Sequence, residues 1–352
     1  MIVKNESAVI KRALDSVRPI IDYWIICDTG STDDTPAIIL QNLHDIPGEL
    51  HRAEWVNFGH NRTQAIQLAK DKADYTLVLD ADMIANIHQP FKHLLTADYY
   101  NIRYEGSVDY TQPMLVSNQH NWTYVGVTHE YLYAPTTNGG SHLPALTLTH
   151  FGDGGMRADK FIRDEKLLLK ELEKDPSNVR NLFYLAQTYR DTQQFEEALH
   201  WYKKRIAAGE GWAEEYWYTL YQIGQMQQAL GYEWEIVLAS YLRAYEKRPT
   251  RLEPIYQIVK YYREHEAYVL GHLYSSVISY AMLYPQDQLF IDKPVYDYLL
   301  LLEHGVCCHG TGRIQEAQEV FEVLLEKEEL PPWVKQATHR GYALCNGVTS
   351  SH

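Results

Sequence analysis

The sequence has little cysteine and no long apolar run, and both absences exclude common classes of protein. Its 352 residues include four cysteines, without a Cys-x-x-Cys pair or a Cys/His cluster at zinc spacing. This usage is typical of reduced structural thiols in a reducing compartment. No segment reaches the ~18 consecutive apolar residues of a membrane span, and residues 1–6 have neither the basic start nor the apolar run of a signal peptide. We therefore expect a cytoplasmic protein without a membrane span.

Basic residues are also scarce relative to acidic ones. The chain has 32 Lys and Arg against 46 Asp and Glu, which gives a formal net charge of −14. Because binding to a phosphate backbone needs clustered Lys and Arg, this balance argues against nucleic acid as the main partner. A nucleotide ligand needs only a local site, and an acidic surface suits a protein that holds a divalent cation.

The first part of the chain alternates strand patterns with helix patterns. Apolar runs at residues 2–3, 23–27 and 75–79 are typical of buried strands, and residues 8–17 and 63–70 have helical spacing. This alternation predicts a mostly parallel sheet with helices on both faces. We expect a Rossmann-like α/β domain over residues 1–158.

From about residue 161 the strand patterns give way to helical spacing of Leu, Ala, Tyr, Glu and Gln. Residues 182–202 fit the tetratricopeptide helix-turn-helix repeat of about 34 residues, and looser copies cover residues 216–249 and 312–325. We expect an all-α tetratricopeptide-like domain over residues 159–352, whose aromatic residues pack between helices. Such repeats present extended concave surfaces, so they are candidates to bind an acceptor or a partner, or to form a homodimer.

Two of the expected strands end in aspartate, at Asp28 and at Asp80. Ligands of open parallel sheets bind at the carboxyl ends of the strands, so both side chains should lie on one rim. The run Asp80-Ala81-Asp82 offers two hard oxygen ligands, which Mn²⁺ and Mg²⁺ prefer together with substrate phosphates. The metal would neutralise charge on a leaving diphosphate. The alternative is a pair of solvated loop acids, and the place after a buried strand favours the functional interpretation.

Two further residues are candidates for the same site. His150 follows an alternating run and precedes a glycine-rich loop, and its imidazole would complete a divalent site that favours Mn²⁺. Arg62 opens the helix before the strand at residues 75–79, where a guanidinium can meet a phosphate or a nucleobase edge. The alternatives are a structural histidine and a surface arginine.

A third constellation runs from Trp122 through Gly126 to the adjacent pair His129 and Glu130. An aromatic residue, a glycine and then this pair are features of a segment that lines the acceptor side of an active site and ends in a catalytic base. A carboxylate can take a proton from an acceptor hydroxyl within hydrogen-bond reach. The alternative is a His-Glu pair that merely holds a loop.

These residues resemble the motifs of glycosyltransferase family 2, which has the GT-A fold. The resemblance lies in Ile-Val-Lys-Asn-Glu at residues 2–6, Asp-Thr-Gly-Ser-Thr-Asp-Asp-Thr at residues 28–35 and Asp-Ala-Asp at residues 80–82. The His-Glu pair and the trailing repeats are similar to those of a bacterial and viral subgroup. The resemblance covers nearly the whole chain, strongly over residues 1–155 and by composition over the repeats.

The resemblance implies roles for individual residues. The residues that would bind a nucleoside-diphosphate sugar, through its base, ribose and phosphates, are Val3, Lys4, Asn5, Glu6, Asp28, Arg62, Asp80 and Ala81. The metal would be held by Asp80, Asp82 and His150. Glu130, with His129 beside it, would be the general base of an inverting transfer to a hydroxyl or thiol.

We therefore expect a metal-dependent inverting glycosyltransferase that uses a UDP- or GDP-linked sugar and a glycan, peptide or protein acceptor. Three features depart from the family pattern: Thr63 replaces Asn after Arg62, Tyr131 replaces a second acid after Glu130, and the chain starts almost inside its first strand. The alternative is a non-catalytic interaction scaffold built on the repeats. A nucleotidyltransferase is disfavoured, because residues 4–8 contain one cation and no glycine to hold a triphosphate.

Overall fold

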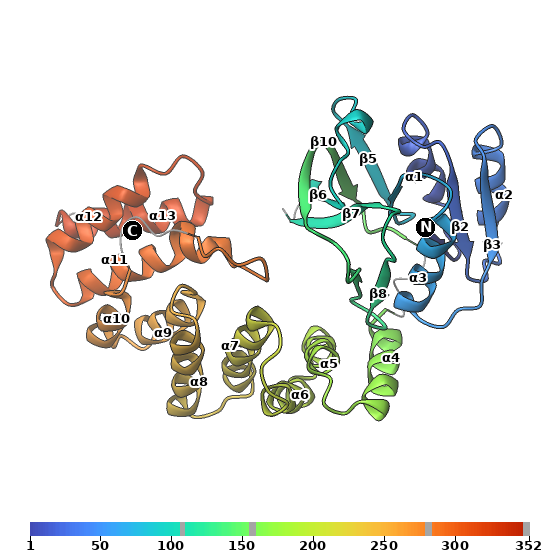
Figure 1. The fold of residues 1–352 in the computed structure, drawn as a ribbon. Coiled ribbons are helices and arrows are strands. Elements are labelled where there is room, and N and C mark those ends of the chain that lie inside the picture. The colour runs from blue at the N-terminus through green and yellow to red at the C-terminus, as the bar shows by residue number, and fades with distance from the viewer. Residues whose placement is uncertain (106–109, 155–159, 279–283, 348–352) are drawn as a thin grey trace. The chain divides into compact units, whose positions relative to one another are not determined.

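The chain forms two compact units, Met1–Pro176 and Ser177–His352, coloured blue to green and green to red in Figure 1. The computed structural model describes residues 1–105, 110–154, 160–278 and 284–347. The first unit combines sheets with helices and the second is helical, as the sequence predicts. The expected domain boundary between residues 158 and 159 lies outside the described residues.

Helix α4 (Lys160–Lys174) belongs to the first unit, although the sequence analysis counted it with the repeats. The guanidinium of Arg163 lies 4.7 Å from the centre of the Phe58 ring. Next to it, the buried carboxyl group of Asp164 hydrogen-bonds Thr128. These contacts attach the helix to residues of the α/β unit, and its own sequence pattern does not reveal them.

A parallel three-stranded sheet opens the chain, with the strand order β1-β2-β3. Its strands are β1 (Ile2–Val3), β2 (Trp24–Asp28) and β3 (Gly48–Arg52). Parallel neighbours need crossover connections, and helices α1 (Ile10–Val17) and α2 (Thr35–Asn42) provide them. Helix α3 (Phe58–Ala69) follows β3 and contacts β1 and β2. The apolar faces meet in a core formed by Val3, Val9, Ile10, Leu14, Ile26, Ile39, Leu43 and Ala81.

A five-stranded sheet follows, with the strand order β4-β7-β6-β10-β5 (Figure 1). Its strands are β4 (Tyr75–Leu77), β5 (Met83–Ile87), β6 (Tyr99–Glu105), β7 (Thr111–Ser117) and β10 (Gly140–His150). Only the β6–β10 pair is parallel here. The expectation of a mostly parallel sheet is therefore wrong for this sheet. In the described segments between β4 and β10 the helical element is one short turn, η1 (Lys92–Leu94), so the chain reverses instead of crossing over.

The same unit contains a small antiparallel hairpin of β8 (Thr123–Val125) and β9 (Tyr131–Tyr133). Its connecting loop holds the predicted His-Glu pair. Helix α3 packs against β8, and the loop therefore lies next to the amino end of that helix.

The second unit is a succession of helices in which each packs against the next. They are α5 (Val179–Asp191), α6 (Phe195–Ala207), α7 (Ala213–Ala229), α8 (Trp234–Lys247), α9 (Glu253–Glu264), α10 (Tyr268–Ser275), α11 (Leu300–Gly310), α12 (Ile314–Leu325) and α13 (Pro332–Cys345), with a π-helical turn η2 (Val295–Leu299) before α11. Helix α7 begins 34 residues after α5 (213 − 179). The three expected repeats correspond to the pairs α5–α6, α7–α8 and α11–α12.

Aromatic residues of the second unit serve mainly to pack helices together, as expected. Trp217 and Tyr221 stack with ring centres 5.7 Å apart, and the buried Tyr241 lies 5.9 Å from Tyr221. Gly224 permits this packing, because a Cβ built there would lie 2.6 Å from Cε1 of Tyr241. In the described part of the chain no helix is long and apolar enough to cross a membrane.

A buried ion cluster fixes the start of α9. Arg251 is fully buried, and its Nη2 lies 2.8 Å from Oε1 of Glu253 and its Nη1 3.1 Å from Oδ2 of Asp287. The same guanidinium donates to the carbonyl oxygens of Leu289 and Phe290. One side chain thus connects the start of α9 to the segment before η2.

Replacing Arg251 by methionine should therefore destabilise the protein by about 3–5 kcal/mol, because Glu253 is left buried without its cation and Asp287 keeps only Arg248. Urea denaturation followed by helical circular dichroism measures the change. Arg243→Met, on the exposed face of α8, is the matched control and should change stability by less than about 0.5 kcal/mol. Equal effects of the two substitutions would contradict the role of the cluster.

Candidate functional site

The carboxyl ends of β1 and β2 form the first part of the predicted rim. Asp28 ends β2 and is 5% exposed, and its Oδ1 accepts a hydrogen bond from the backbone N–H of Ser31 at 2.9 Å. Val3 is buried in the core, and its carbonyl oxygen accepts from the N–H of Thr29. Lys4 lies half-buried just beyond the end of β1. Among these predicted donor-binding residues, Asp28 uses one carboxylate oxygen in the hydrogen bond to Ser31. The Val3 side chain belongs to the core.

The loops that follow β1 and β2 are hydrogen-bonded to each other. Asn5 adopts a left-handed backbone with φ of +56°, which its side chain tolerates. The Asn5 N–H donates to Oγ of Ser31, and Asn5 Oδ1 accepts from the N–H of Thr32 at 2.7 Å. The Glu6 N–H donates to Oγ1 of Thr35 at 2.7 Å. The predicted Lys-Asn-Glu segment is therefore held in one conformation by the segment that contains the second predicted motif.

Asp82 and His150 meet on the same rim, although they are 68 residues apart in the chain. Antiparallel pairing of β10 with β5 places His150 opposite Met83, next to Asp82. The Nε2 of His150 lies 3.1 Å from Oδ2 of Asp82. Burial raises the pKa of Asp82, but the interaction with His150 outweighs it, and the net pKa is lowered.

Glu6 also approaches Asp82, around a glycine of the loop after β10. A Cβ built on Gly154 would lie 3.2 Å from Oε2 of Glu6 and 3.3 Å from Oδ2 of Asp82. A side chain at position 154 would therefore enter the space between the two carboxylates. Gly154 belongs to the glycine-rich loop after His150 and to none of the three motifs that resemble the glycosyltransferase family.

Arg62 occupies the centre of a second cluster on the rim. Its Nη2 lies 2.7 Å from Oδ1 of Asp80, and its Nε lies 2.7 Å from Oε1 of Glu130, an ion pair whose angle does not suit a hydrogen bond. The ring of Tyr124 lies 5.8 Å from the guanidinium. Asp80 thus faces Arg62 in this structure, whereas its neighbour Asp82 faces His150.

Charge and burial act against each other in this cluster. Burial lowers the pKa of the Arg62 guanidinium, but the carboxylates of Asp80 and Glu130 outweigh it and raise that pKa above its ordinary value. Burial raises the pKa of Glu130, which is 11% exposed, and Arg62 offsets this only in part. A carboxylate with a raised pKa is a better proton acceptor near neutral pH than an exposed one.

The loop that carries Glu130 is pressed against the amino end of α3. A Cβ built on Gly59 would lie 2.0 Å from the carbonyl oxygen of Gly126, so the close approach requires glycine at position 59. Thr63, a departure from the family pattern, accepts a hydrogen bond at its Oγ1 from the N–H of Tyr124 at 2.8 Å. His129 has a φ of +50°, which turns the chain just before Glu130. The loop is therefore positioned by main-chain contacts with α3.

Sequence reasoning did not find the contacts of Arg12 at this rim. Arg12 on α1 donates two hydrogen bonds to Asp153, at 3.1 and 2.7 Å, and its guanidinium lies 3.9 Å from the centre of the Phe151 ring. These contacts hold the segment after His150 against α1. The residues are separated by 141 positions, and no local pattern connects them.

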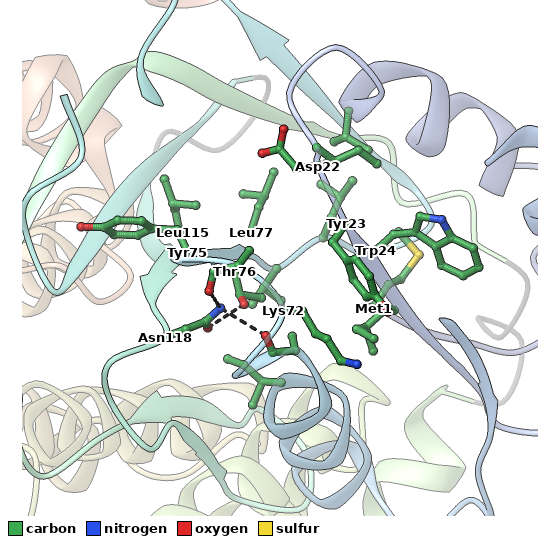
Figure 2. Close-up of a pocket in the computed structure, with 18 of the residues that line it drawn as sticks. Met1, Asp22, Tyr23, Trp24, Lys72, Tyr75, Thr76, Leu77, Leu115 and Asn118 are labelled. Carbon is green, nitrogen blue, oxygen red and sulfur yellow. Dashed lines mark hydrogen bonds between the residues drawn. The ribbon is translucent and has the colours of Figure 1, made fainter. Parts of the chain in front are cut away.

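A cavity of about 990 Å³ lies elsewhere in the first unit. Figure 2 shows Asp22, Tyr23 and Trp24 lining it together with Tyr75 and Thr76, which lie at or before the amino ends of β2 and β4. Ligands of open α/β sheets bind at the carboxyl ends. Of the predicted site residues, Arg62 alone lines the cavity. The candidate site is therefore the rim and not this cavity.

The residues on the rim fit a divalent cation in part. Asp82 and His150 offer a carboxylate oxygen and an imidazole nitrogen that face each other, a combination that Mn²⁺ accepts. Glu6 lies close by, and the glycine at position 154 leaves the space beside them open. Two protein ligands plus phosphate oxygens of a substrate is a usual arrangement for such ions.

One family model matches most of the first unit. Residues 1–137 match the model of the family described as Glycosyl transferase family 2. That range includes Asp28, Arg62, Asp80, Asp82 and Glu130. The first unit therefore carries a glycosyltransferase family 2 domain, joined to a helical domain.

Two curated relatives match shorter segments. An uncharacterised glycosyltransferase of Rickettsia felis is 37% identical over 82 residues, which are 23% of this chain and 27% of that protein. A TPR repeat-containing protein of Synechococcus elongatus is 41% identical over 83 residues, 23% of this chain and 19% of that protein. The chain spans less than a third of the length of either relative.

Solved structures with some likeness are tetratricopeptide proteins. One from Parabacteroides merdae has a TM-score of 0.40 and 18% identity, and covers 54% of this chain and 70% of its own. The MamA protein has a TM-score of 0.37 and 19% identity, and covers 49% of this chain and 91% of its own.

The connection between the two rim loops leads to a prediction about Asp33. Its carboxylate accepts from the N–H of Ser7 and from Thr35. Burial raises the pKa of Asp33, but these hydrogen bonds outweigh it and lower the pKa to about 2, from an ordinary value of 3.8. Asp33→Asn should therefore cost about 1 kcal/mol of unfolding free energy at neutral pH.

Because the folded-state pKa is depressed, this contribution is present above pH 3.8 and is lost as the pH falls towards about 2. Urea denaturation at several pH values measures it, with the exposed neighbour Asp34→Asn as control. A difference between wild type and Asp33→Asn that stays constant below pH 3.8 would contradict the assignment.

Proposed function

We propose that the protein is a metal-dependent inverting glycosyltransferase that uses a UDP- or GDP-linked sugar. The contact between Asp82 and His150 at the carboxyl-end rim carries this proposal. The pair lies beside the ordered Lys-Asn-Glu segment, where a nucleotide can bind at the strand ends. The match to the glycosyltransferase family model supports the same reaction class.

Asp82 and His150 would hold a Mn²⁺ or Mg²⁺ ion, with Glu6 close to both. When bound, the ion supplies charge neutralisation for the diphosphate that leaves. Asp28 and the segment Lys4 to Glu6 would contact the base and ribose. Their loops are hydrogen-bonded to each other, so the donor site needs little ordering when the nucleotide binds.

Glu130 would act as the general base. The acceptor hydroxyl or thiol attacks the anomeric carbon, the bond from that carbon to the diphosphate oxygen breaks, and the acceptor proton passes to the Glu130 carboxylate. Arg62 would position Glu130 and Asp80, since it contacts both and is nearly buried. His129 precedes the base in a turned conformation and would shape the acceptor side.

Removal of a metal ligand tests the donor half of the reaction. Asp82→Asn keeps the shape of the side chain but removes its charge, and should weaken Mn²⁺-dependent binding of the nucleoside diphosphate by about 100-fold. Isothermal titration with UDP and GDP, with and without Mn²⁺, measures this. Asp22→Asn, an exposed acid beside the amino end of β2, is the control and should bind as wild type does. Undiminished binding to Asp82→Asn would remove Asp82 from the metal site.

Glu130→Gln tests the chemical step. The amide keeps contact with Arg62 but cannot accept the proton, so turnover should fall by about 10²- to 10⁴-fold while donor binding persists. The assay is sugar transfer to an acceptor found by mass spectrometry, or donor hydrolysis where no acceptor is known. The acid limb of the wild-type pH–rate profile should also disappear. Transfer at the wild-type rate would show that another group is the base.

The helical unit supports a second candidate function, that of a non-catalytic interaction scaffold. The helices form hairpins of the kind that bind peptides or proteins. In the scaffold alternative, binding a partner on this surface would be the only function of the protein. A peptide or protein acceptor held by the helices, or a homodimer formed through them, is compatible with the enzyme. Incubation with several nucleotide sugars and Mn²⁺ separates the two functions. Absence of nucleoside diphosphate release and of thermal stabilisation by UDP or GDP would favour the scaffold.

A further inference from the structure

A group of metal-ligating side chains lies within the helical unit. His272 on α10, Cys308 on α11 and Glu316 on α12 place their ligand atoms within 4.8 Å of one another. His304 lies one turn before Cys308 on α11, and its Nε2 lies 3.4 Å from Oε1 of Glu316. The sequence analysis found no cysteine–histidine cluster at zinc spacing, because these residues come from three helices.

Three distances among these side chains match those between ligands of one tetrahedral ion. Oε1 of Glu316 lies 3.3 Å from Nε2 of His272 and 3.4 Å from Nε2 of His304, and Sγ of Cys308 lies 3.6 Å from Nε2 of His304. Zinc bonds of about 2.0–2.3 Å at tetrahedral angles put neighbouring ligand atoms about 3.3–3.7 Å apart. The three distances fall in that range, and the ligand atoms of His272, Cys308 and Glu316 lie within 4.8 Å of one another around one point.

The environment orients the His304 imidazole towards this point. Its Nδ1 lies 2.7 Å from Oγ of Ser275, whose hydroxyl donates to the carbonyl oxygen of His272 at 3.2 Å. With its hydrogen directed to that carbonyl, the Ser275 oxygen can accept from Nδ1–H, which is the tautomer that metal binding through Nε2 requires. In that tautomer the lone pair of Nε2 faces the Glu316 carboxylate at 3.4 Å, so that both could ligate one cation. An outer hydrogen bond of this kind is usual for metal-bound histidine. The other oxygen of Glu316 lies 3.9 Å from Nη1 of Arg313.

We propose that His272, His304, Cys308 and Glu316 form a structural Zn²⁺ site in the helical unit. The mixture of thiolate, imidazole and carboxylate suits zinc and excludes Mg²⁺ and Ca²⁺, which prefer oxygen alone. On binding, the Cys308 thiol loses its proton to solvent and the sulfur bonds the ion. The thiolate and the Glu316 carboxylate then balance the two positive charges of the ion.

The site has a structural purpose that the fold makes apparent. Helix α10 has eight residues and buries only Gly271 and Ser275 fully, while Val269 and Leu273 are 73% and 62% exposed. Apolar packing of this helix therefore rests mainly on Tyr268 and Tyr274, which are partly buried against the neighbouring core. An ion bound to His272 would clip α10 to both α11 and α12, and metal binding would add directly to folding stability.

Metal content of the full chain tests the proposal, with two adjacent buried cysteines as test and control. Cys308→Ser removes a ligand, whereas Cys307→Ser changes a neighbour that packs beside Gly271 in another cluster. After dialysis against EDTA and addition of zinc, mass spectrometry of the metal should find one tightly held zinc per chain in wild type and in Cys307→Ser. Cys308→Ser should lose at least tenfold in zinc affinity. A wild type that binds no zinc, or equal affinity in the two variants, would overturn the site.

Cobalt substitution distinguishes this site from the rim. It also tests the proposal in the case that the Cys308→Ser variant fails to fold. Wild type loaded with Co²⁺ should show a thiolate-to-cobalt charge-transfer band, which Asp82 and His150 at the rim cannot produce. The band should persist in Cys307→Ser and in Asp82→Asn, and should weaken in Glu316→Gln. Absence of the thiolate band in wild type, or its presence at full strength in Cys308→Ser, would overturn the proposal.

Discussion

The candidate site depends on the placement of one buried cation. The Arg62 side chain is 15% exposed, and an unpaired guanidinium there would cost several kcal/mol. The structure meets this requirement with Asp80 from the segment after β4 and Glu130 from the loop between β8 and β9. These ion pairs compensate the positive charge of Arg62 on α3. They also bring Asp80, the first acid of the Asp-Ala-Asp motif, next to Glu130, the proposed base. Glycine at position 59 allows this loop to come close enough.

Local patterns predicted much of this arrangement. The strand patterns around residues 23–27 and 75–79 located Asp28 and Asp80 at the carboxyl ends of strands, and β2 and β4 lie within one to two residues of those limits. The helical spacing after residue 161 predicted the hairpins α5–α6, α7–α8 and α11–α12. These features follow from periodicity and from which residues must be buried, so one sequence is enough to see them.

Other features depend on contacts between distant segments, and periodicity does not encode them. The five-stranded sheet is mostly antiparallel because its chain reverses without helical crossovers, and His150 meets Asp82 only through the register of β10 on β5. Arg62 faces two carboxylates, where the sequence suggested a phosphate or a nucleobase edge. Helix α4 joins the first unit through Arg163 and Asp164, which a helical pattern alone assigns to the repeats. The proposed zinc ligands come from three helices, so no local sequence motif identifies them.

The central claim is that the rim formed by the ends of the strands binds a metal and a nucleoside diphosphate together. Crystals of the full chain grown with Mn²⁺ and UDP or GDP would test this most directly, through anomalous scattering at the manganese edge. The account predicts one manganese peak within bonding distance of Asp82 and His150, with the diphosphate bound to it and the nucleoside beside Asp28. A manganese peak away from both side chains, or a nucleotide bound in the cavity at the amino ends of β2 and β4, would contradict it.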